Sequence, residues 1–430
     1  MTRRVLIAGG GIGGLATALS ASKAGWNVDL FERAMSFSEV GAGVQLGPNV
    51  ARLLHGWGLA QALDRVAAFP ERLQVRDALS GHELGVLPLG RQVLQKYGAP
   101  YATVHRADLH GLLLQAVRSN GHASLTLNSS VSGYTDNGHG ITLQMQANSA
   151  VAQLQQAAGS CVGLTAGAEV NGDALVGADG LWSQVRSLML NDAQPRVTGH
   201  LAYRALLPQS SLPARLRSQQ VTVWLGPKLH VVHYPVRAGE WLNVVAIVQG
   251  KVAGDLQSWD HSANSVQLQN ATQSTAAMLR DLIQAVTDSG NLTSPAWRLW
   301  ALCDRPPMSG AFQQAKGRVA LLGDAAHPMR PYLAQGAGMA IEDAAELGTQ
   351  LAQASEPGFD TATALGHYAL ARWQRNARVQ ARAVRNGQIF HAQGPLRWAR
   401  DASMKLLGKK LLDMPWLYGN IPKSSELLEK

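Results

Sequence analysis

The chain contains few cysteines: only Cys161 and Cys303 occur in 430 residues. They do not have metal-ligand spacing, and so few thiols are typical of a reduced, cytoplasmic protein. The sequence also lacks an apolar run long enough to cross a bilayer. It lacks a signal peptide as well, because Met1–Arg4 leads directly into a short strand. These absences predict a cytoplasmic protein without membrane insertion.

Charged residues are scarce too, at 16% against 46% hydrophobic residues, a balance typical of a globular protein with two or three domains. The net charge is +9, but no nucleic-acid motif accompanies it, so we expect no nucleic-acid partner. Some arginines recur at near-helical spacing, which we interpret as a solvated helix face. Attraction of an anionic substrate or cofactor stays open. These arginines are Arg372, Arg375, Arg378, Arg382 and Arg385.

A glycine-rich loop follows the first apolar run, Val5–Ala8. Gly9, Gly11 and Gly14 form a G-x-G-x-x-G pattern, after which a helix to Lys23 and a strand ending at Glu32 are expected. In this context the first glycine permits a tight turn, the second lets a pyrophosphate approach, and the third lets the helix pack on the strand. The helix N-terminus favours phosphate, and the Glu32 carboxylate is placed to bind ribose hydroxyls. The sequence therefore predicts a dinucleotide site, without choosing between FAD and NAD.

Two further strand-to-loop junctions follow much later. A strand from Ala174 runs into Asp179-Gly180, with a helix beginning near Ser183. Another strand, residues 318–322, runs into Gly323-Asp324, and a helix begins around Gly338. Ligands bind at the carboxyl ends of parallel strands. Two glycine-rich loops so far apart suggest a long, two-part ligand bound at both ends.

These motifs together resemble the FAD-dependent aromatic hydroxylases, the single-component flavoprotein monooxygenases. The order and spacing match across roughly residues 1–390. The resemblance implies an α/β fold with a Rossmann-type FAD-binding domain, an inserted β-sheet substrate domain and a C-terminal helical region. We expect the FAD-binding domain at residues 1–190 and 306–390, the substrate domain at 191–305, and a C-terminal tail at 391–430. Homodimers are common among such relatives.

The resemblance also implies how FAD is held. The adenosine and pyrophosphate would lie along the first glycine loop, Asp324 would bind the ribityl chain, and amides near Gly336 would face the flavin pyrimidine ring. Gln45 lies in a flavin-bordering loop, residues 41–49, and Arg106 matches an arginine that contacts FAD. His327 is expected to shape the flavin pocket and not to act as a base. The predicted cofactor residues are Gly9, Gly11, Gly14, Glu32, Arg33, Gln45, Arg106, Asp179, Asp324, Gly336, Ala337 and Gly338.

The middle of the chain, about residues 195–300, consists of β-type runs suited to a sheet over a substrate site. Period-two spacing puts His230, Val232 and Tyr234 on one face, and Val231 and His233 on the other. In related hydroxybenzoate hydroxylases, the matching strand contributes a histidine and a tyrosine to the substrate pocket. We therefore predict that His230 and Tyr234 are catalytic or substrate-binding, with simple packing in a sheet as the alternative.

The loop after His327-Pro328 bears on the substrate. In 3-hydroxybenzoate 6-hydroxylases a glutamine of this loop contacts substrate, whereas the match here is Pro331. The loop looks more like that of salicylate hydroxylases and 6-hydroxynicotinate monooxygenases. Arg330 is predicted to pair with a substrate carboxylate, or to point into solvent.

The activity implied is an NAD(P)H-consuming monooxygenase. NADH or NADPH would reduce FAD, O2 would give a flavin C4a-hydroperoxide, and an electron-rich phenolic ring would attack it, with His230 as base. We favour salicylate, converted to catechol with decarboxylation. The alternatives are 3-hydroxybenzoate 6-hydroxylation, 6-hydroxynicotinate 3-monooxygenation, a flavoprotein dehydrogenase or oxidase without oxygen insertion, and a flavin-containing binding protein.

Overall fold

The computed structural model describes residues 3–37, 42–147, 167–251, 255–256, 261–262, 265–290, 296–354 and 359–419. Cys161, residue 41 of the flavin-bordering loop and the end of the chain lie outside the described residues. We also predict from the small, polar residues of the stretch at about 138–170 a hairpin with an elongated loop, and residues 148–166 of that stretch lie outside the described residues. None of the described helices is both long and apolar enough to cross a membrane.

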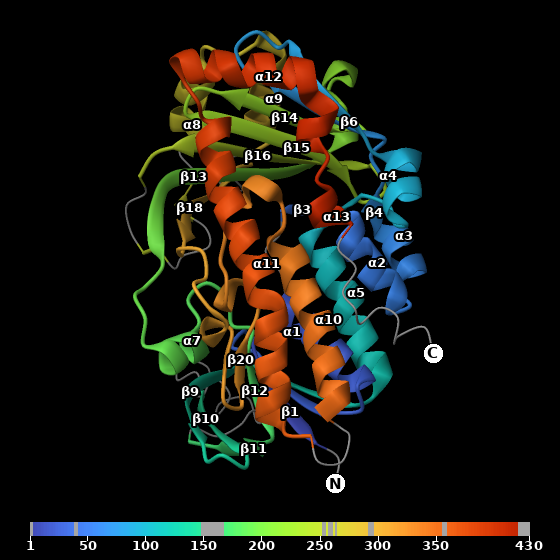
Figure 1. Ribbon diagram of the computed structural model, residues 1–430. Helices are drawn as coiled ribbons and strands as arrows, with labels where there is room; N and C mark the ends of the chain where they lie inside the picture. Colours follow the sequence, from blue (N-terminus) through green and yellow to red (C-terminus); the bar gives the residue numbers. More distant parts are fainter. Residues whose placement is uncertain are drawn as a thin grey trace.

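A six-stranded sheet lies in the half of the molecule that contains the N-terminus (Figure 1). Its central strands pair in parallel. In spatial order they are β19 (Ala315–Lys316), β20 (Val319–Leu321), β12 (Ala174–Gly177), β1 (Arg4–Ala8), β2 (Asn27–Phe31) and β8 (Ala123–Thr126).

Both faces of this sheet are covered. Helices α1 (Ile12–Lys23), α5 (Arg106–Asn120) and α10 (Gly336–Ala354) pack together on one face. A small antiparallel sheet of β9 (Ser129–Asp136), β10 (Ile141–Ala147) and β11 (Glu169–Gly172) covers the other. Buried leucines such as Leu6 and Leu143 join these layers, which explains why the central strands read as continuous apolar runs.

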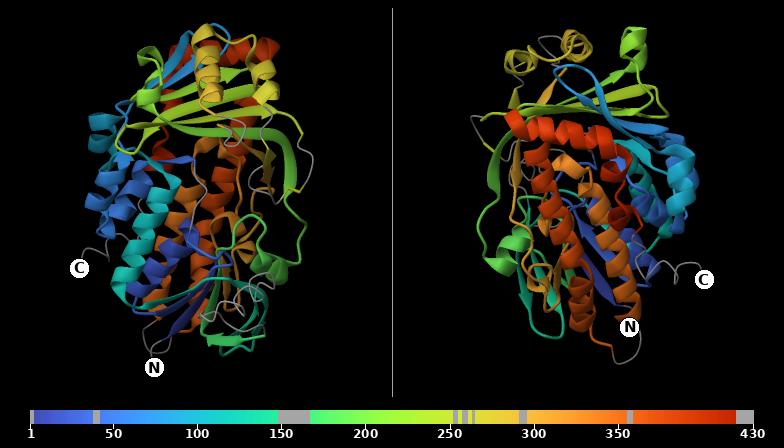
Figure 2. Two further views of the ribbon diagram at one scale, coloured as in Figure 1. Left: turned by 180° about the vertical axis from the view of Figure 1, so that it is seen from behind. Right: turned by 45° about the horizontal axis from the view of Figure 1, so that its top comes forward.

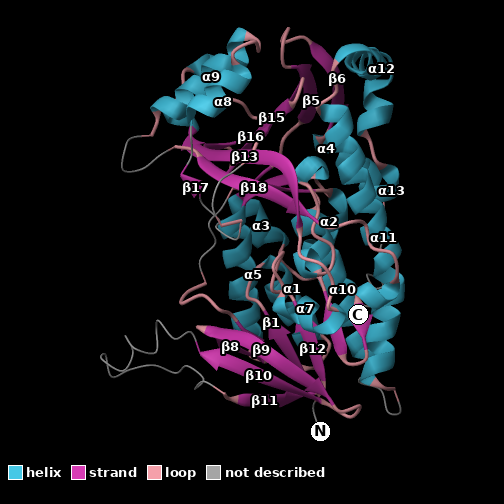
Figure 3. Cartoon of the chain, turned by 90° about the vertical axis from the view of Figure 1, so that its left-hand side faces the viewer, coloured by secondary structure: helices cyan, strands magenta, loops and turns pink. Residues whose placement is uncertain are grey.

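An eight-stranded sheet lies at the opposite end of the molecule from β9–β11 (Figure 3). Strands β5 and β6 extend this sheet, although they lie within residues 1–190, which we assign from the sequence to the FAD-binding domain. The domain boundaries therefore stay a prediction. In spatial order the strands are β17 (His261–Ser262), β18 (Arg298–Asp304), β13 (Arg196–Pro208), β16 (Trp241–Gln249), β15 (Leu229–Val236), β14 (Val221–Gly226), β5 (Arg72–Asp77) and β6 (Glu83–Pro88).

Helices cover the two faces of the large sheet unequally. The pair α8 (Ser265–Thr272) and α9 (Ala277–Asp288) lies on one side, and α11 (Thr361–Phe390) and α12 (Gly394–Leu412) lie on the other (Figure 2). The segment expected as a C-terminal tail thus contains a long helix. The short helix α13 (Pro415–Tyr418) packs back on the protein, because Arg375 donates hydrogen bonds to the carbonyls of Trp416 and Leu417.

The remaining elements connect the two halves. A small sheet joins β3, β7 and β4. Short helices pack beside it, and α7 follows the second strand-to-loop junction. These elements are β3 (Gly43–Leu46), β4 (Ala67–Ala68), β7 (Ala102–His105), α2 (Pro48–Gly56), α3 (Ala60–Val66), α4 (Gly90–Tyr97) and α7 (Gln184–Leu190).

Candidate functional site

The three strand-to-loop junctions meet at one edge of the parallel sheet. Strands β1, β12 and β20 are neighbours, so their carboxyl ends bring the loops at Gly9, Asp179 and Asp324 around one cavity of about 300 Å³. The expected convergence is present. The predicted cofactor residues that line it are Gly9, Gly11, Glu32, Arg33, Arg106, Asp179, Asp324, Gly336 and Ala337.

Two predicted glycines serve packing instead. A Cβ on Gly14 would lie 1.9 Å from the carbonyl oxygen of Gly9, so α1 packs against the loop as expected of the third glycine. A Cβ on Gly338 would lie 2.9 Å from Val50. By contrast, a Cβ on Gly336 would meet nothing within 4 Å, and this residue lines the cavity at the first turn of α10.

The two outer carboxylates already have backbone partners. Glu32 accepts hydrogen bonds from the amides of Gly10 (2.6 Å) and Ala34 (2.8 Å). Asp179 accepts from the Ser183 hydroxyl and from the amide of Gln184 (2.8 Å), which fixes the start of α7. A carboxylate oxygen has more than one acceptor direction, so neither arrangement blocks a ribose hydroxyl.

Asp324 is the carboxylate left for a ligand. Its side chain is exposed to the cavity but lies deep in the protein, where burial raises its pKa and the charge of Arg106 opposes that shift. None of the described residues donates a hydrogen bond to it. The Asp324 carboxylate can accept hydrogen bonds from the hydroxyls of a flavin nucleotide. The open space at Gly336 leaves room for the flavin ring. The residues of this cavity therefore fit such a cofactor.

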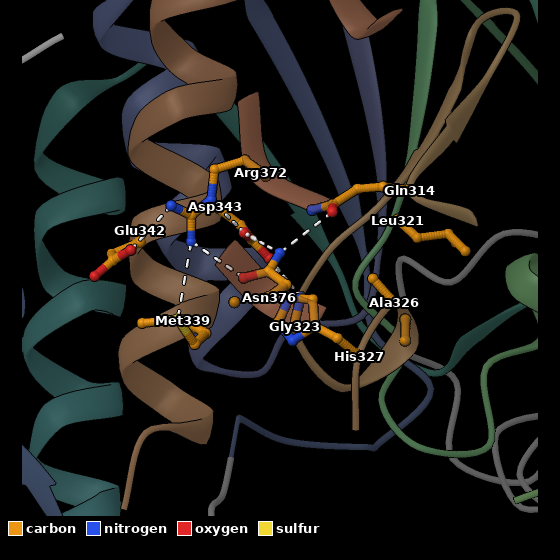
Figure 4. A network of polar contacts seen from close by, with 12 residues as sticks. Gln314, Leu321, Gly323, Ala326, His327, Met339, Glu342, Asp343, Arg372 and Asn376 are labelled. Carbon is orange, nitrogen blue, oxygen red and sulfur yellow. Dashed lines mark hydrogen bonds and ion pairs between the residues drawn. The ribbon is translucent and has the colours of Figure 1, made fainter. Parts of the chain in front are cut away.

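A buried ionic network holds the Asp324 loop (Figure 4). Asp343 on α10 accepts from His327 Nε2 (2.5 Å), Arg372 Nε (2.8 Å) and the Gly323 amide (3.2 Å). Burial opposes the charge on Asp343, but His327 and Arg372 lower its pKa below the usual value. Arg372 also binds Glu342 (2.9 Å). The network ties two helices to the cofactor loop.

This network corrects the interpretation of the arginine cluster. Arg372 is buried and Arg375 mostly so, and both pair with Glu342. The prediction of a solvated face is wrong for these two residues, because the carboxylates of α10 face them. His327 is fully buried, as a loop-shaping role requires.

A second, larger cavity of about 590 Å³ lies between the eight-stranded sheet and the C-terminal helices. His230, Gln45 and Pro331 line it, among the predicted residues. The loop at Ala334, which lines this cavity, leads directly to Gly336, which lines the cofactor cavity. The two cavities are therefore adjacent.

His230 belongs to an aromatic cluster that the sequence did not reveal. Its Nδ1 lies 2.8 Å from His391 Nε2, and the ring of Tyr332 is 5.0 Å away. Tyr332 in turn hydrogen-bonds His200. Burial lowers the pKa of His230 well below 6.5 and that of His391 to about 3, so both imidazoles are neutral at neutral pH.

The other predicted substrate residues are placed differently. Tyr234 is buried, and burial raises its pKa; it is not among the cavity-lining residues. Arg330 binds Asp304 at 2.7 Å, a partner that neither sequence alternative included. Arg204, which we did not select, has a buried Nε without a partner among the described residues and lies over the Trp300 ring at 4.6 Å.

The fold and the cofactor cavity define a flavoprotein with a separate substrate sheet. The family model described as "FAD binding domain" matches residues 2–383. The chain therefore belongs to the FAD-dependent aromatic hydroxylases, as the sequence motifs predicted, and is an FAD-dependent aromatic monooxygenase. FAD is its cofactor, with NAD(P)H as reductant and O2 as co-substrate.

Relatives match along nearly the whole chain. It is 34% identical to 3-hydroxybenzoate 6-hydroxylase 1 of Aquipseudomonas alcaligenes, over 97% of this chain and 98% of that protein. It is 33% identical to 6-hydroxynicotinate 3-monooxygenase of Bordetella bronchiseptica, over 88% and 89%. A solved salicylate hydroxylase substrate complex is 26% identical, with a TM-score of 0.77 over 99% of this chain and 98% of that chain.

Proposed function

We propose that this monooxygenase hydroxylates a phenolic aromatic acid whose ring lies in the larger cavity beside His230. The observation that carries the proposal is the His230–His391 hydrogen bond of 2.8 Å at the wall of that cavity. Bound FAD, reduced by NAD(P)H, supplies an activated oxygen atom derived from O2. Salicylate is the first candidate. The alternatives, 3-hydroxybenzoate and 6-hydroxynicotinate, are substrates that the names of two relatives contain.

His230 accepts the phenolic proton during the reaction. When its Nδ1 carries hydrogen and donates to His391, Nε2 is an unprotonated acceptor for the substrate hydroxyl. Because a phenol has a pKa near ~10 and His230 a pKa well below 6.5, the proton stays on the phenol before reaction. It moves to Nε2 as the ring loses electron density to oxygen, which makes the hydroxyl more acidic.

The surrounding residues orient this base and exclude water. His391 holds the ring plane of His230 through the hydrogen bond at Nδ1. Val232 and Phe390 supply apolar walls, which limit the water that competes for the activated oxygen. The Asp324 loop and the first turn of α10 would hold FAD at the adjoining cavity. The positive end of helix α10 at that turn would favour negative charge on the bound cofactor.

The experiment combines a substrate panel with a matched pair of histidine variants. Purified holoprotein is incubated with NADH or NADPH and with salicylate, 3-hydroxybenzoate, 6-hydroxynicotinate or 4-hydroxybenzoate, and the products are identified. His230→Gln is expected to lower hydroxylation by about 10²-fold or more while FAD binding survives. His233→Gln is the control, because His233 is buried on the opposite face of the same strand.

Two results would count against the proposal. One is the absence of hydroxylated product from every acid in the panel. The other is an equal effect of the His230 and His233 substitutions, since this would reduce His230 to a packing residue. The cytoplasmic location stays a prediction and the homodimer a possibility implied by the resemblance; cell fractionation and sedimentation would test them.

A further inference from the structure

The larger cavity exceeds what a hydroxybenzoate ring needs. It measures about 590 Å³, and pockets of roughly 300–1,000 Å³ enclose drug-sized ligands. Hydroxybenzoate has only about ten non-hydrogen atoms, far fewer than such ligands. His230 and Tyr332 line one region, and Met404 and Leu411 line another that belongs to α12. Space therefore extends from the proposed base to the C-terminal helix.

Strand register makes the floor of this cavity continuously apolar. Val223 on β14 lies opposite Val75 on β5 and opposite Val232 on β15. One step along the same face, Leu225 lies opposite His230. All of these residues line the cavity, so the apolar floor begins next to the proposed base and crosses three strands.

Helix α12 spans the cavity and is fixed near both ends. Near its start, Arg397 binds Asp77 of β5 at 2.5 Å. Near its end, a Cβ on Gly408 would lie 3.0 Å from Gly85 of β6, so helix and strand are in close contact. Between these contacts the helix lines the cavity with residues such as Ala399. The space is thus held open by fixed contacts on either side.

The charge on the lining has one sign. Arg382, Arg385 and Arg400 line the cavity, and no aspartate or glutamate does so among the described residues. Asp401, outside the lining, pairs with Arg400 at 2.7 Å, so the attraction of an anion comes from Arg382 and Arg385. Arg382 has a buried Nε without a hydrogen-bond partner among those residues, and burial together with Arg385 lowers its pKa. An electropositive, mainly apolar cavity favours an anion with an apolar body.

We infer that the substrate is a phenolic aromatic acid that carries an apolar substituent. The substituent packs on the apolar floor formed by Val75, Val223 and Val232, beneath α12. This inference rests on the proposed function and names its substrate class. The ring with its hydroxyl lies at His230, the substituent extends over Val223, and the arginines attract the acid. An unsubstituted hydroxybenzoate fills only part of the space.

Isothermal titration of the holoprotein tests this without turnover. The ligands are hydroxybenzoates with no chain, a propyl chain or a hexyl chain at each free ring position, together with the neutral amides and with ring-free alkyl carboxylates of equal length. At one ring position, affinity is expected to rise roughly two- to fourfold per added methylene. No gain at any position would overturn the inference, and so would equal binding of the ring-free carboxylates.

Matched variants locate the effect. Val223→Phe should abolish the gain from the chain and leave affinity for the unsubstituted acid within about twofold, whereas Val266→Phe, at an exposed position of α8, should change neither. Arg382→Gln should remove most of the preference for acid over amide. Arg378→Gln, which instead loses contact with the Trp416 ring, should keep that preference. A chain-length gain that survives Val223→Phe would contradict the placement.

Product analysis of the same ligands separates the two proposals. Tighter binding of alkylated acids without hydroxylation of any ligand supports the cavity assignment and defeats the proposed function. Hydroxylation of unsubstituted acids, without any gain in affinity from the alkyl chain, supports the proposed function and defeats the cavity assignment.

Discussion

Replacing Asp343 by asparagine should strongly destabilise the protein. The carboxylate accepts four hydrogen bonds, from His327, Arg372, Asn376 and the Gly323 amide. Asparagine retains one acceptor oxygen and turns an NH2 group toward donors, so at least two of these bonds are lost. It also leaves the buried Arg372 with Glu342 as its one carboxylate partner among the described residues. Breaking a buried charged pair typically costs about 3–5 kcal/mol, and we expect a loss in that range.

Urea unfolding of the holoprotein measures this loss, with Asp281→Asn as the matched control. Asp281 binds Arg215 at 2.9 Å, but its side chain is 45% exposed, so its loss should cost less than about 1 kcal/mol. Asp343→Asn should also weaken FAD binding, since Asp343 holds the Gly323 amide beside Asp324. Equal effects of the two substitutions on unfolding would refute the reasoning that burial makes the Asp343 network stabilising.

Further predictions concern the glycine loop and the buried histidines. Gly14→Ala should lower FAD affinity at least tenfold, because its Cβ would lie 1.9 Å from the carbonyl oxygen of Gly9. Gly111→Ala is the control and should leave the affinity unchanged, because its Cβ would meet nothing within 4 Å. Fluorescence titration of the apoprotein with FAD measures both affinities, and equal values would disprove the packing argument. Burial lowers the pKa of His391 to about 3 and that of His233 to about 4, so the unfolded chain binds more protons and stability should fall as pH drops below about 6.5. At pH 5 each of these histidines should lower the free energy of unfolding by about 2 kcal/mol, and His391→Gln should abolish the contribution of His391. Urea unfolding as a function of pH measures this. The same pH dependence in His391→Gln and the unsubstituted protein would contradict the assignment of a buried neutral imidazole.

The cofactor cavity could be predicted from the sequence because each of its loops is recognisable from neighbouring residues. Each loop follows directly from an apolar strand, and parallel strands bring their carboxyl ends to one edge. Gly9, Asp179 and Asp324 therefore met as expected, and the period-two rule placed His230 on the face that lines the larger cavity.

What the sequence did not predict depends on contacts between distant segments. His391 meets His230 across 161 residues, and no periodicity encodes that meeting. Arg330 finds Asp304 on a separate strand, and Arg372 finds the acids of α10. Charged residues at helical spacing are interpreted as solvent-exposed unless the helix that packs against them is known. The burial of these ion pairs could therefore be predicted only from the tertiary structure.

Oxygen transfer is the central claim, and it can be measured directly. The holoprotein is supplied with NAD(P)H, the best-bound phenolic acid and 18O2, and the product is examined by mass spectrometry. One 18O atom per hydroxylated product is the predicted result. An oxidised product without 18O would contradict it and assign the protein to the dehydrogenases or oxidases.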